Sequence, residues 1–298
     1  MSKNFLNEYN NLLSKTDLVS SLGNLDLGAY LAGGAITSVF TNKDINDYDL
    51  YFRDAESFAK FFGLWLDGDF GASVVLSATN KSITIHFPNE EVIVQAIYYK
   101  WFPSAEDIFD DFDFTVNMGA YCFKEGMFIL HKDFLRHNAQ RYLEVNTNTS
   151  FPLITALRVE KYKTKGYNIS KANFLKIMFS VMKLNIKDWE DLKEHIGGMY
   201  GLKVAELFNT EKEFSVEEVL SQLSDSLINS GEQALKSVEW SEVKEKMYPL
   251  LPTVIKEKVE LIPEWSLFSQ GGTMFSRFEE LLESNSCDIC GSKQNIPY

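Results

Sequence analysis

The first hundred residues alternate between helical and strand-like spacing of their apolar positions. Helical spacing predicts a helix over residues 4–22, and an aromatic stripe from Phe58 to Trp65 predicts a second helix, capped by Asp54 and ended by Gly68. Three apolar runs separated by turn residues then predict strands at 72–79, 82–87 and 91–99. Because the connections between these strands are short, we expect a mixed sheet with antiparallel hairpins.

Beyond residue 149 the spacing is helical. Pro152 opens a helix, and Ser170 is expected to cap the next one. That second helix carries apolar residues that we expect to face inward, namely Leu175, Met178, Phe179 and Met182. A polar run at 146–150 marks the boundary. The chain is therefore predicted to be an α+β protein, with a mixed β-sheet and flanking helices at 1–148 and an all-helical domain at 149–298.

The stretch from Tyr30 to Phe52 combines features that chemistry can use. A short apolar run ends at Gly33 and Gly34, a short helical piece follows, and Asp47-Tyr48-Asp49 opens an alternating segment that is typical of a strand. The alternation places both carboxylates on one side of that strand. Glycines let the backbone approach an anion closely, and a helix start can donate N–H groups to it. Carboxylates are ligands for Mg²⁺ or Mn²⁺, and such a metal neutralises a transferring phosphoryl group.

Composition narrows the classes of function. Hydrophobic residues make up 45% of the 298-residue chain, which favours a folded core. No apolar run is long enough for a membrane span, the N-terminus lacks a signal-peptide pattern, and three cysteines are too few for a disulfide framework. We therefore expect a cytoplasmic protein with no membrane partner. The net charge of −13 disfavours a non-specific nucleic-acid binder, because such proteins neutralise phosphates with a basic surface.

Three segments together resemble a known family. Gly33-Gly34 followed by Asp47-x-Asp49 is similar to the signature of the polymerase-β-type nucleotidyltransferase superfamily. The interval of 47 − 34 = 13 residues between Gly34 and Asp47 resembles the branch of tRNA nucleotidyltransferases and class II bacterial poly(A) polymerases. The segment at 113–121, DFTVNMGAY, resembles the "RRDFTxNAxAY" element of that branch, and the stretch at 157–167 lies where the branch has an "RxxRFxxxxGF" helix.

The resemblance implies a catalytic head domain that transfers a nucleoside monophosphate from a nucleoside triphosphate, such as ATP, to an acceptor hydroxyl. It implies Asp47 and Asp49 as the catalytic metal ligands, with Mg²⁺ or Mn²⁺ as the cofactor. By the same resemblance, the residues expected to bind the nucleotide are Gly33, Gly34, Ser38, Asp113, Asn117, Arg158 and Lys161. The implied acceptor is the 3′ end of tRNA or another RNA.

The chain departs from the family pattern in ways that leave alternatives open. Asp111 and Phe112 stand where the branch has two arginines, and the strand that often carries a third carboxylate offers Gln95 instead. Asp113 is either a third metal ligand or a structural hydrogen-bond acceptor. A nucleotidyltransferase that modifies a protein or a small molecule fits the acidic composition better than an RNA enzyme does. A binding or structural protein that keeps the fold without catalysis fits the missing arginines.

Two further features leave chemistry undecided. The densest positive stretch comprises Arg158, Lys161, Lys163, Lys165, Lys171 and Lys176, and it either faces the cleft or forms a solvated helix face. Near the C-terminus, Cys287 and Cys290 form a CxxC pair that supplies two of the four ligands of a closed zinc site. Cys122 with a histidine, or a second copy of the chain, could complete such a site; free thiols are the alternative.

Overall fold

A seven-stranded mixed sheet forms the centre of the computed structural model, which describes residues 5–24, 27–67, 70–79, 81–149, 151–196, 208–229, 240–251, 253 and 256. The strands lie in the order β3-β4-β5-β2-β1-β6-β7. They are β1 (Ala29–Ala32), β2 (Tyr48–Phe52), β3 (Val74–Ala78), β4 (Ser82–Phe87), β5 (Val92–Ile97), β6 (Gly119–Cys122) and β7 (Met127–Leu130). Only the β2–β5 pair is parallel among the pairs of this sheet.

Successive side chains along each strand point to opposite faces of the sheet. Leu31, Leu50 and Phe52 pack on one face in a large core to which several helices contribute side chains. The helices of the first part of the chain in this core are α1 (Leu6–Leu13), α2 (Asp17–Asn24), α3 (Gly34–Phe40) and α4 (Ala55–Leu66). The aromatic stripe of α4, including Phe58 and Trp65, is fully buried here, as its helical spacing predicted.

The opposite face carries Tyr30 and Tyr51, and α5 (Ala105–Asp111) packs on it together with the segment that leads into α5. Asp49 alternates with Leu50, so its side chain belongs to this second face. The only described helix in the core of this second face is the short α5. The end of β2 that carries Asp49 is therefore not covered by a helix here, and it borders a cavity.

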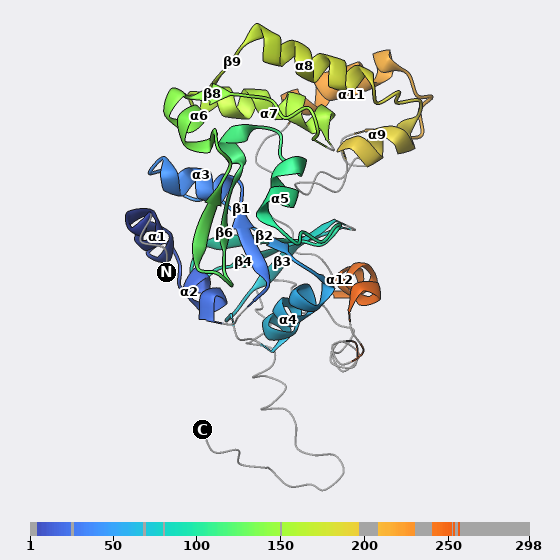
Figure 1. Cartoon of the computed structure of the whole chain (residues 1–298). Helices are drawn as coiled ribbons and strands as arrows, with labels where there is room; N and C mark the ends of the chain where they lie inside the picture. Colours follow the sequence, from blue (N-terminus) through green and yellow to red (C-terminus); the bar gives the residue numbers. More distant parts are fainter. Residues whose placement is uncertain are drawn as a thin grey trace, which may run out of the picture.

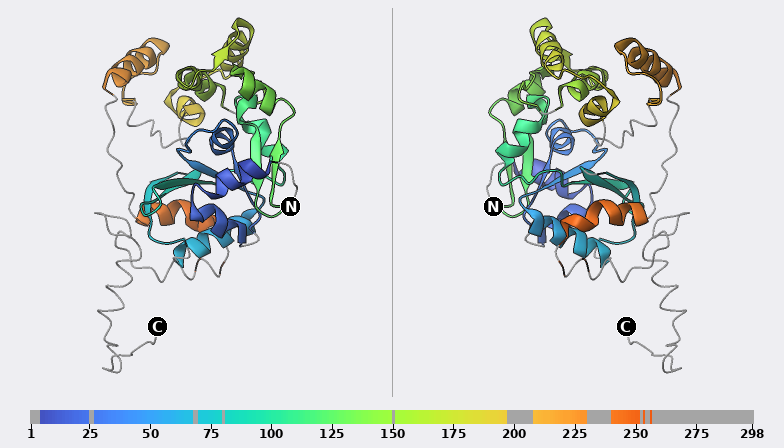
Figure 2. Two further views of the ribbon diagram at one scale, coloured as in Figure 1. Left: turned by 90° about the vertical axis from the view of Figure 1, so that its left-hand side faces the viewer. Right: turned by 90° about the vertical axis from the view of Figure 1, so that its right-hand side faces the viewer.

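The remaining helices gather in two places (Figure 1). One group lies beyond one end of the sheet and comprises η1 (Thr115–Asn117), α6 (Phe134–Gln140), α7 (Pro152–Thr164), α8 (Lys171–Met182), α9 (Trp189–Ile196) and α11 (Val216–Asn229), with the two-stranded sheet of β8 (Tyr142–Leu143) and β9 (Asn168–Ile169). By contrast, α12 (Trp240–Met247) and η2 (Tyr248–Leu250) lie beside the large sheet (Figures 1 and 2). Val243 and Met247 of α12 are buried in its main core.

The predicted fold class is confirmed: a mixed sheet with flanking helices is followed by helices. Side-chain caps lie where the sequence predicted them, because Asp54 accepts from the Ser57 N–H, and Ser170 from the Asn173 N–H. The single helix predicted at 4–22 is two helices, α1 and α2, with a break after Leu13. The division at residue 148 stays a prediction.

The prediction for α8 was wrong. Leu175, Met178, Phe179 and Met182, which were expected to face inward, are 48%, 47%, 60% and 73% exposed. The buried side of α8 contains Asn173 and Ile177 instead. Asn173 is polar, but its amide nitrogen donates to the Tyr142 hydroxyl (2.7 Å) and the Leu143 carbonyl (3.0 Å), which offsets the desolvation of its N–H groups.

Two predictions concern the membrane and the C-terminal cysteines. Across the described ranges, no helix combines the length and the apolar character that a bilayer span requires. Cys287 and Cys290 lie outside the described residues, so the zinc hypothesis stays a prediction.

Candidate functional site

A turn at Gly33 brings the end of β1 next to an aspartate of β2. Gly33 has φ = 79°, a conformation that favours glycine, and its N–H donates to the Gly119 carbonyl at 3.1 Å. A Cβ atom at this position would lie 3.6 Å from Asp49 Oδ2 and 3.4 Å from the Phe112 ring. The diglycine turn and the Asp-x-Asp pair, which are separated in sequence, therefore meet in space.

The two carboxylates border a small cavity of about 50 Å³. Asp49 is paired in register with Ala32 of β1 and Gln95 of β5, which fixes its backbone in the middle of the sheet. Its Oδ1 atom is buried and has no hydrogen-bond partner among the described residues. Burial, together with the neighbouring Asp47 carboxylate, raises the pKa of Asp49 to about 8 against the opposing effect of Arg158 and Lys161. The positive charge of Arg158 and Lys161 therefore does not offset the burial of Asp49.

Positive charge reaches the cavity from α7 and the residue that follows it. Arg158, Lys161 and Lys165 line the same cavity as Asp47 and Asp49. Lys165 is half-buried, and this burial together with the Lys161 charge lowers its pKa, while the Asp47 carboxylate acts in the opposite direction. Oppositely charged groups thus converge on one space within a chain of net charge −13. Such an arrangement suits a ligand that combines a divalent metal with phosphate groups.

Contacts along one face of α7 fix the helix and its Arg158 side chain beside the cavity. Thr155 donates to Asp113 Oδ1 at 2.7 Å, and Arg158 forms a buried ion pair with the same carboxylate. One turn further on, the Tyr162 hydroxyl donates to Asn117 Oδ1 at 2.7 Å. Asp113 is only 2% exposed and its oxygens are occupied, which favours the structural role weighed for it over a metal-ligand role.

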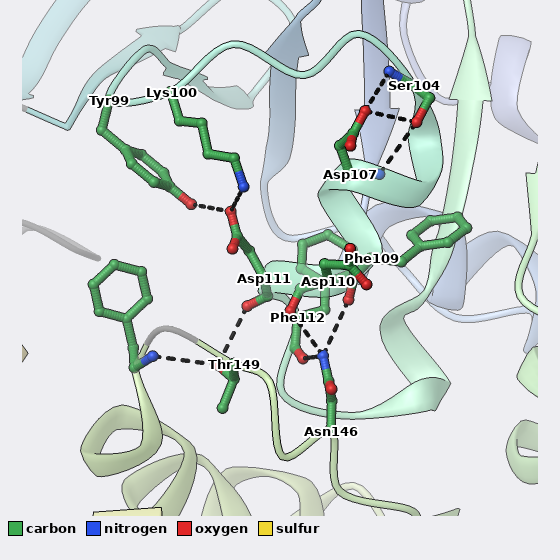
Figure 3. Close-up of polar contacts among 11 residues, drawn as sticks. Tyr99, Lys100, Ser104, Asp107, Phe109, Asp110, Asp111, Phe112, Asn146 and Thr149 are labelled. Carbon is green, nitrogen blue, oxygen red and sulfur yellow. Dashed lines mark hydrogen bonds and ion pairs between the residues drawn. The ribbon is translucent and has the colours of Figure 1, made fainter. Parts of the chain in front are cut away.

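The residues that replace the two family arginines have other contacts (Figure 3). The Asp111 carboxylate accepts hydrogen bonds from the Tyr99 hydroxyl and the Lys100 ammonium, both at 3.0 Å. The amide of Asn146 donates to the carbonyls of Asp110 and Phe112, both at 2.9 Å, and so satisfies the end of α5.

Phe112 forms a wall of the cavity rather than a charged contact. It is 9% exposed, its ring lies beside Gly33, and it packs edge-on against Tyr51 with 5.8 Å between ring centroids. Where the family pattern has an arginine, this chain therefore presents an apolar surface.

Eight of the nine predicted site residues line this one cavity: Gly33, Gly34, Ser38, Asp47, Asp49, Asn117, Arg158 and Lys161. Asp113 lies behind it, in contact with Arg158. The cavity also contains Asn46, Tyr51, Tyr162 and Lys165, which were not among the predicted site residues. Tyr51 could have been found, because it is two residues beyond Asp49 on the same side of the strand.

The donor set fits a hard divalent cation. Carboxylate oxygens are the ligands that Mg²⁺ and Mn²⁺ prefer, and the buried Oδ1 of Asp49 has no hydrogen-bond partner in the part of the chain that the structure describes. Within the described ranges, no cluster of three or more His, Cys, Asp or Glu side chains is placed to hold a metal. Gln95 stands beside Asp49 and donates to Ser82 Oγ at 3.1 Å. Two carboxylates are thus available, and Mg²⁺ usually completes such a set with water and substrate phosphates.

The structure brings the diglycine turn next to the Asp-x-Asp pair at the start of β2, which is the meeting that the resemblance to polymerase-β-type nucleotidyltransferases implied. A family model described as "Gad2: Gabija anti-defense 2 family protein" matches residues 1–141. A curated relative named Gabija anti-defense 2, from Bacillus phage SPbetaL7, is 43% identical over 203 residues, which cover 67% of this chain and 50% of the relative. The chain thus spans about half the length of that relative.

Solved structures that are similar to the chain come from the branch that its motifs resemble. One is a CCA-adding enzyme in complex with ATP, with a TM-score of 0.48, 14% identity and coverage of 84% of this chain and 71% of that one. Another is the Thermotoga maritima CCA-adding enzyme in complex with tRNA, with a TM-score of 0.45, 15% identity and coverage of 84% and 71%. These are distant likenesses of fold.

Proposed function

We propose that the protein is a metal-dependent nucleotidyltransferase that transfers a nucleoside monophosphate from a nucleoside triphosphate to an acceptor hydroxyl. The observation that carries the proposal is the Asp49 carboxyl group beside Gly33, whose buried Oδ1 has no hydrogen-bond partner among the described residues, in a cavity that Arg158 and Lys161 also line. A buried carboxyl oxygen without a hydrogen-bond partner costs free energy, and a bound metal ion would offset that cost.

Each part of the cavity has a role in this reaction. Asp47 and Asp49 would hold Mg²⁺, which when bound supplies charge neutralisation at the α-phosphate. Gly33 leaves room for phosphate oxygens, and Lys161 and Lys165 offset their charge. The acceptor oxygen forms a bond to the α-phosphorus, the bond to the pyrophosphate oxygen breaks, and the hydroxyl proton passes to solvent. Arg158, held by Asp113, supplies a fixed positive field next to the carboxylates.

The acceptor is better explained as a protein or a small molecule than as RNA. The net charge of −13 disfavours a long polyanion, whose binding depends on neutralised phosphates. The contacts of Asp111 with Tyr99 and Lys100, and the apolar wall formed by Phe112, support the same choice. A tRNA 3′ end, which the family resemblance implied, is the competing acceptor.

The similarity to Gabija anti-defense 2 supports a biological role. We propose that the transfer serves to counter a Gabija defence, the activity that the name of the phage relative indicates. A phage that carries this chain should then form plaques on a host with that defence, and the Asp49→Asn variant should not restore plaque formation. Equal plaque numbers with the wild-type chain and with Asp49→Asn would contradict a role for transfer in countering the defence.

Incubation with labelled triphosphates tests the chemistry. The full chain is mixed with each labelled ribonucleoside triphosphate and Mg²⁺, with and without bulk tRNA or a host lysate. The control variant is Asp110→Asn, which removes an exposed carboxylate of α5. We expect label on a protein or small molecule, reduced at least about 100-fold by Asp49→Asn and unchanged by Asp110→Asn.

Two outcomes would redirect the proposal. Label on tRNA would assign the RNA acceptor. Incorporation that is equal in the wild type and Asp49→Asn, or absent from every mixture, would favour a protein that keeps the fold for binding alone.

A further inference from the structure

A second and larger cavity opens beside the carboxylate cavity. Its volume is about 390 Å³, against about 50 Å³ for the first. The two share Gly34, Ser38, Asn46, Tyr162 and Lys165 as lining residues, so they are contiguous. The larger one extends along α3 toward the end of α6 and has room for a ligand group that the first cavity cannot hold.

The larger cavity is basic. Lys43, Arg141 and Lys165 come from three separate parts of the chain and all line it. Among the described residues, none of these three cations takes part in an ion pair. The one acidic residue in the described lining, Asp44, is bound to Lys15 at 3.2 Å and its side chain is 98% exposed. The Asp47 carboxylate of the adjoining cavity acts on Lys165, and the described lining of the larger cavity still keeps an excess of positive charge.

Arg141 occupies a backbone position where arginine is unusual. It follows α6 with φ = 52° and ψ = 44°, the left-handed conformation in which helices usually end with glycine or asparagine. A non-glycine residue in this conformation costs free energy, and such residues cluster at functional sites. The Arg141 carbonyl accepts from the Asn168 N–H at 2.8 Å, so the backbone is firmly held.

The side chain of Arg141 lies on a fixed aromatic platform. Its guanidinium carbon is 5.1 Å from the centroid of the Tyr167 ring, and the Tyr167 hydroxyl donates to Asn138 Oδ1 at 2.6 Å. An arginine that is stacked in this way presents a planar set of N–H donors, which matches the geometry of phosphate oxygens. The conformational cost at Arg141 is thus explained if its side chain binds an anion.

We propose that this basic cavity binds a phosphate group, supplied either by the terminal phosphates of the donor triphosphate or by a phosphate on the acceptor. The part that this site plays in transfer rests on the proposed function. Phosphate binding by Arg141 itself does not depend on it.

Titration calorimetry on the full chain tests the site. The probes are inorganic pyrophosphate, adenosine 5′-monophosphate and adenosine, without a divalent metal. The matched control is Arg136→Gln, which removes another arginine of α6 that is 61% exposed and paired with Asp133 at 2.9 Å. We expect both phosphate-bearing probes to bind and adenosine not to, with binding weakened at least about tenfold by Arg141→Gln and unchanged by Arg136→Gln.

A second variant separates binding from folding. Arg141→Gly removes the guanidinium and relieves the left-handed backbone, so we expect pyrophosphate binding to be lost while the Tm stays the same or rises. Pyrophosphate binding that is as tight in Arg141→Gln as in the wild type, or adenosine binding equal to that of the monophosphate, would overturn the proposal.

Two further arms identify the source of the phosphate and separate this site from the transferase. If ATP with Mg²⁺ excludes pyrophosphate and is weakened by Arg141→Gln, the donor occupies the cavity; if ATP and the monophosphate bind together, the acceptor does. Both results support the site. The Asp49→Asn variant should keep its Arg141-dependent pyrophosphate binding, so the cavity can stand even where transfer is not observed.

Discussion

Gly33 is the residue on which the geometry of the site depends most closely. Replacing it with alanine should cost about 1–3 kcal/mol of unfolding free energy, because φ = 79° is strained for any other residue. The added Cβ would also contact Phe112 and Asp49 and should weaken triphosphate binding. Urea unfolding measures the first effect. Gly34→Ala is the matched control, since its Cβ would meet no atom within 4 Å; equal stability losses in the two variants would contradict the strain at Gly33.

Asp113 tests whether the link between α7 and the segment that joins α5 to η1 is structural. Asp113→Asn leaves Arg158 buried without its ionic partner and should cost about 3–5 kcal/mol in urea unfolding. Glu160→Gln on the same helix removes the exposed pair with Lys163 and should stay within about 0.5 kcal/mol. An Asp113→Asn variant as stable as Glu160→Gln would show that the ion pair does not hold α7.

Residues whose type and spacing are dictated by chemistry could be predicted from the sequence, whereas residues brought to the site by three-dimensional proximity could not. Asp47 and Asp49 could be found because two acids on one side of a strand border the same space. Arg141 lies at the end of a helix with no motif around it, and its backbone is held by a hydrogen bond from Asn168, a residue far along the chain.

At the scale of elements, spacing predicted helices well but not which face of each is buried. In α8 the apolar stripe was expected inside because apolar residues usually pack together. The buried face of α8 contains Asn173 and Ile177 instead. Asn173 is held there by a hydrogen bond from its amide nitrogen to the Leu143 carbonyl of β8. Hydrophobic periodicity alone carries no information about such partners.

This correction can be tested by polar substitution in α8. Phe179 is 60% exposed, so Phe179→Ser should change the unfolding free energy by no more than about 0.5 kcal/mol. Ile177 is 2% exposed, and Ile177→Ser should cost about 3 kcal/mol or more. Thermal unfolding of both variants gives the comparison, and a larger loss for Phe179→Ser would restore the inward orientation that the sequence favoured.

At the scale of the whole molecule, the two predicted halves share a core. The helical part supplies α7 to the candidate site and α12 to the main sheet, where Met247 is fully buried. Met247→Ala should therefore lower the free energy of unfolding by about 2–5 kcal/mol. Hydrogen exchange of the β3 backbone amides measures this loss within the sheet itself. Unchanged exchange in β3 would mean that the halves are energetically independent. Such a long-range contact is not readable from local patterns, because it depends on the path of the chain.

The most direct test of the central claim is calorimetric binding of each ribonucleoside triphosphate to the full chain, with and without Mg²⁺. We expect at least one triphosphate to bind only when the metal is present, with Asp49→Asn weakening that binding at least about tenfold and Asp110→Asn leaving it unchanged. Absence of binding for all four triphosphates, or equally tight binding by Asp49→Asn, would contradict the claim that the Asp47–Asp49 pair and the diglycine turn form a metal–nucleotide site.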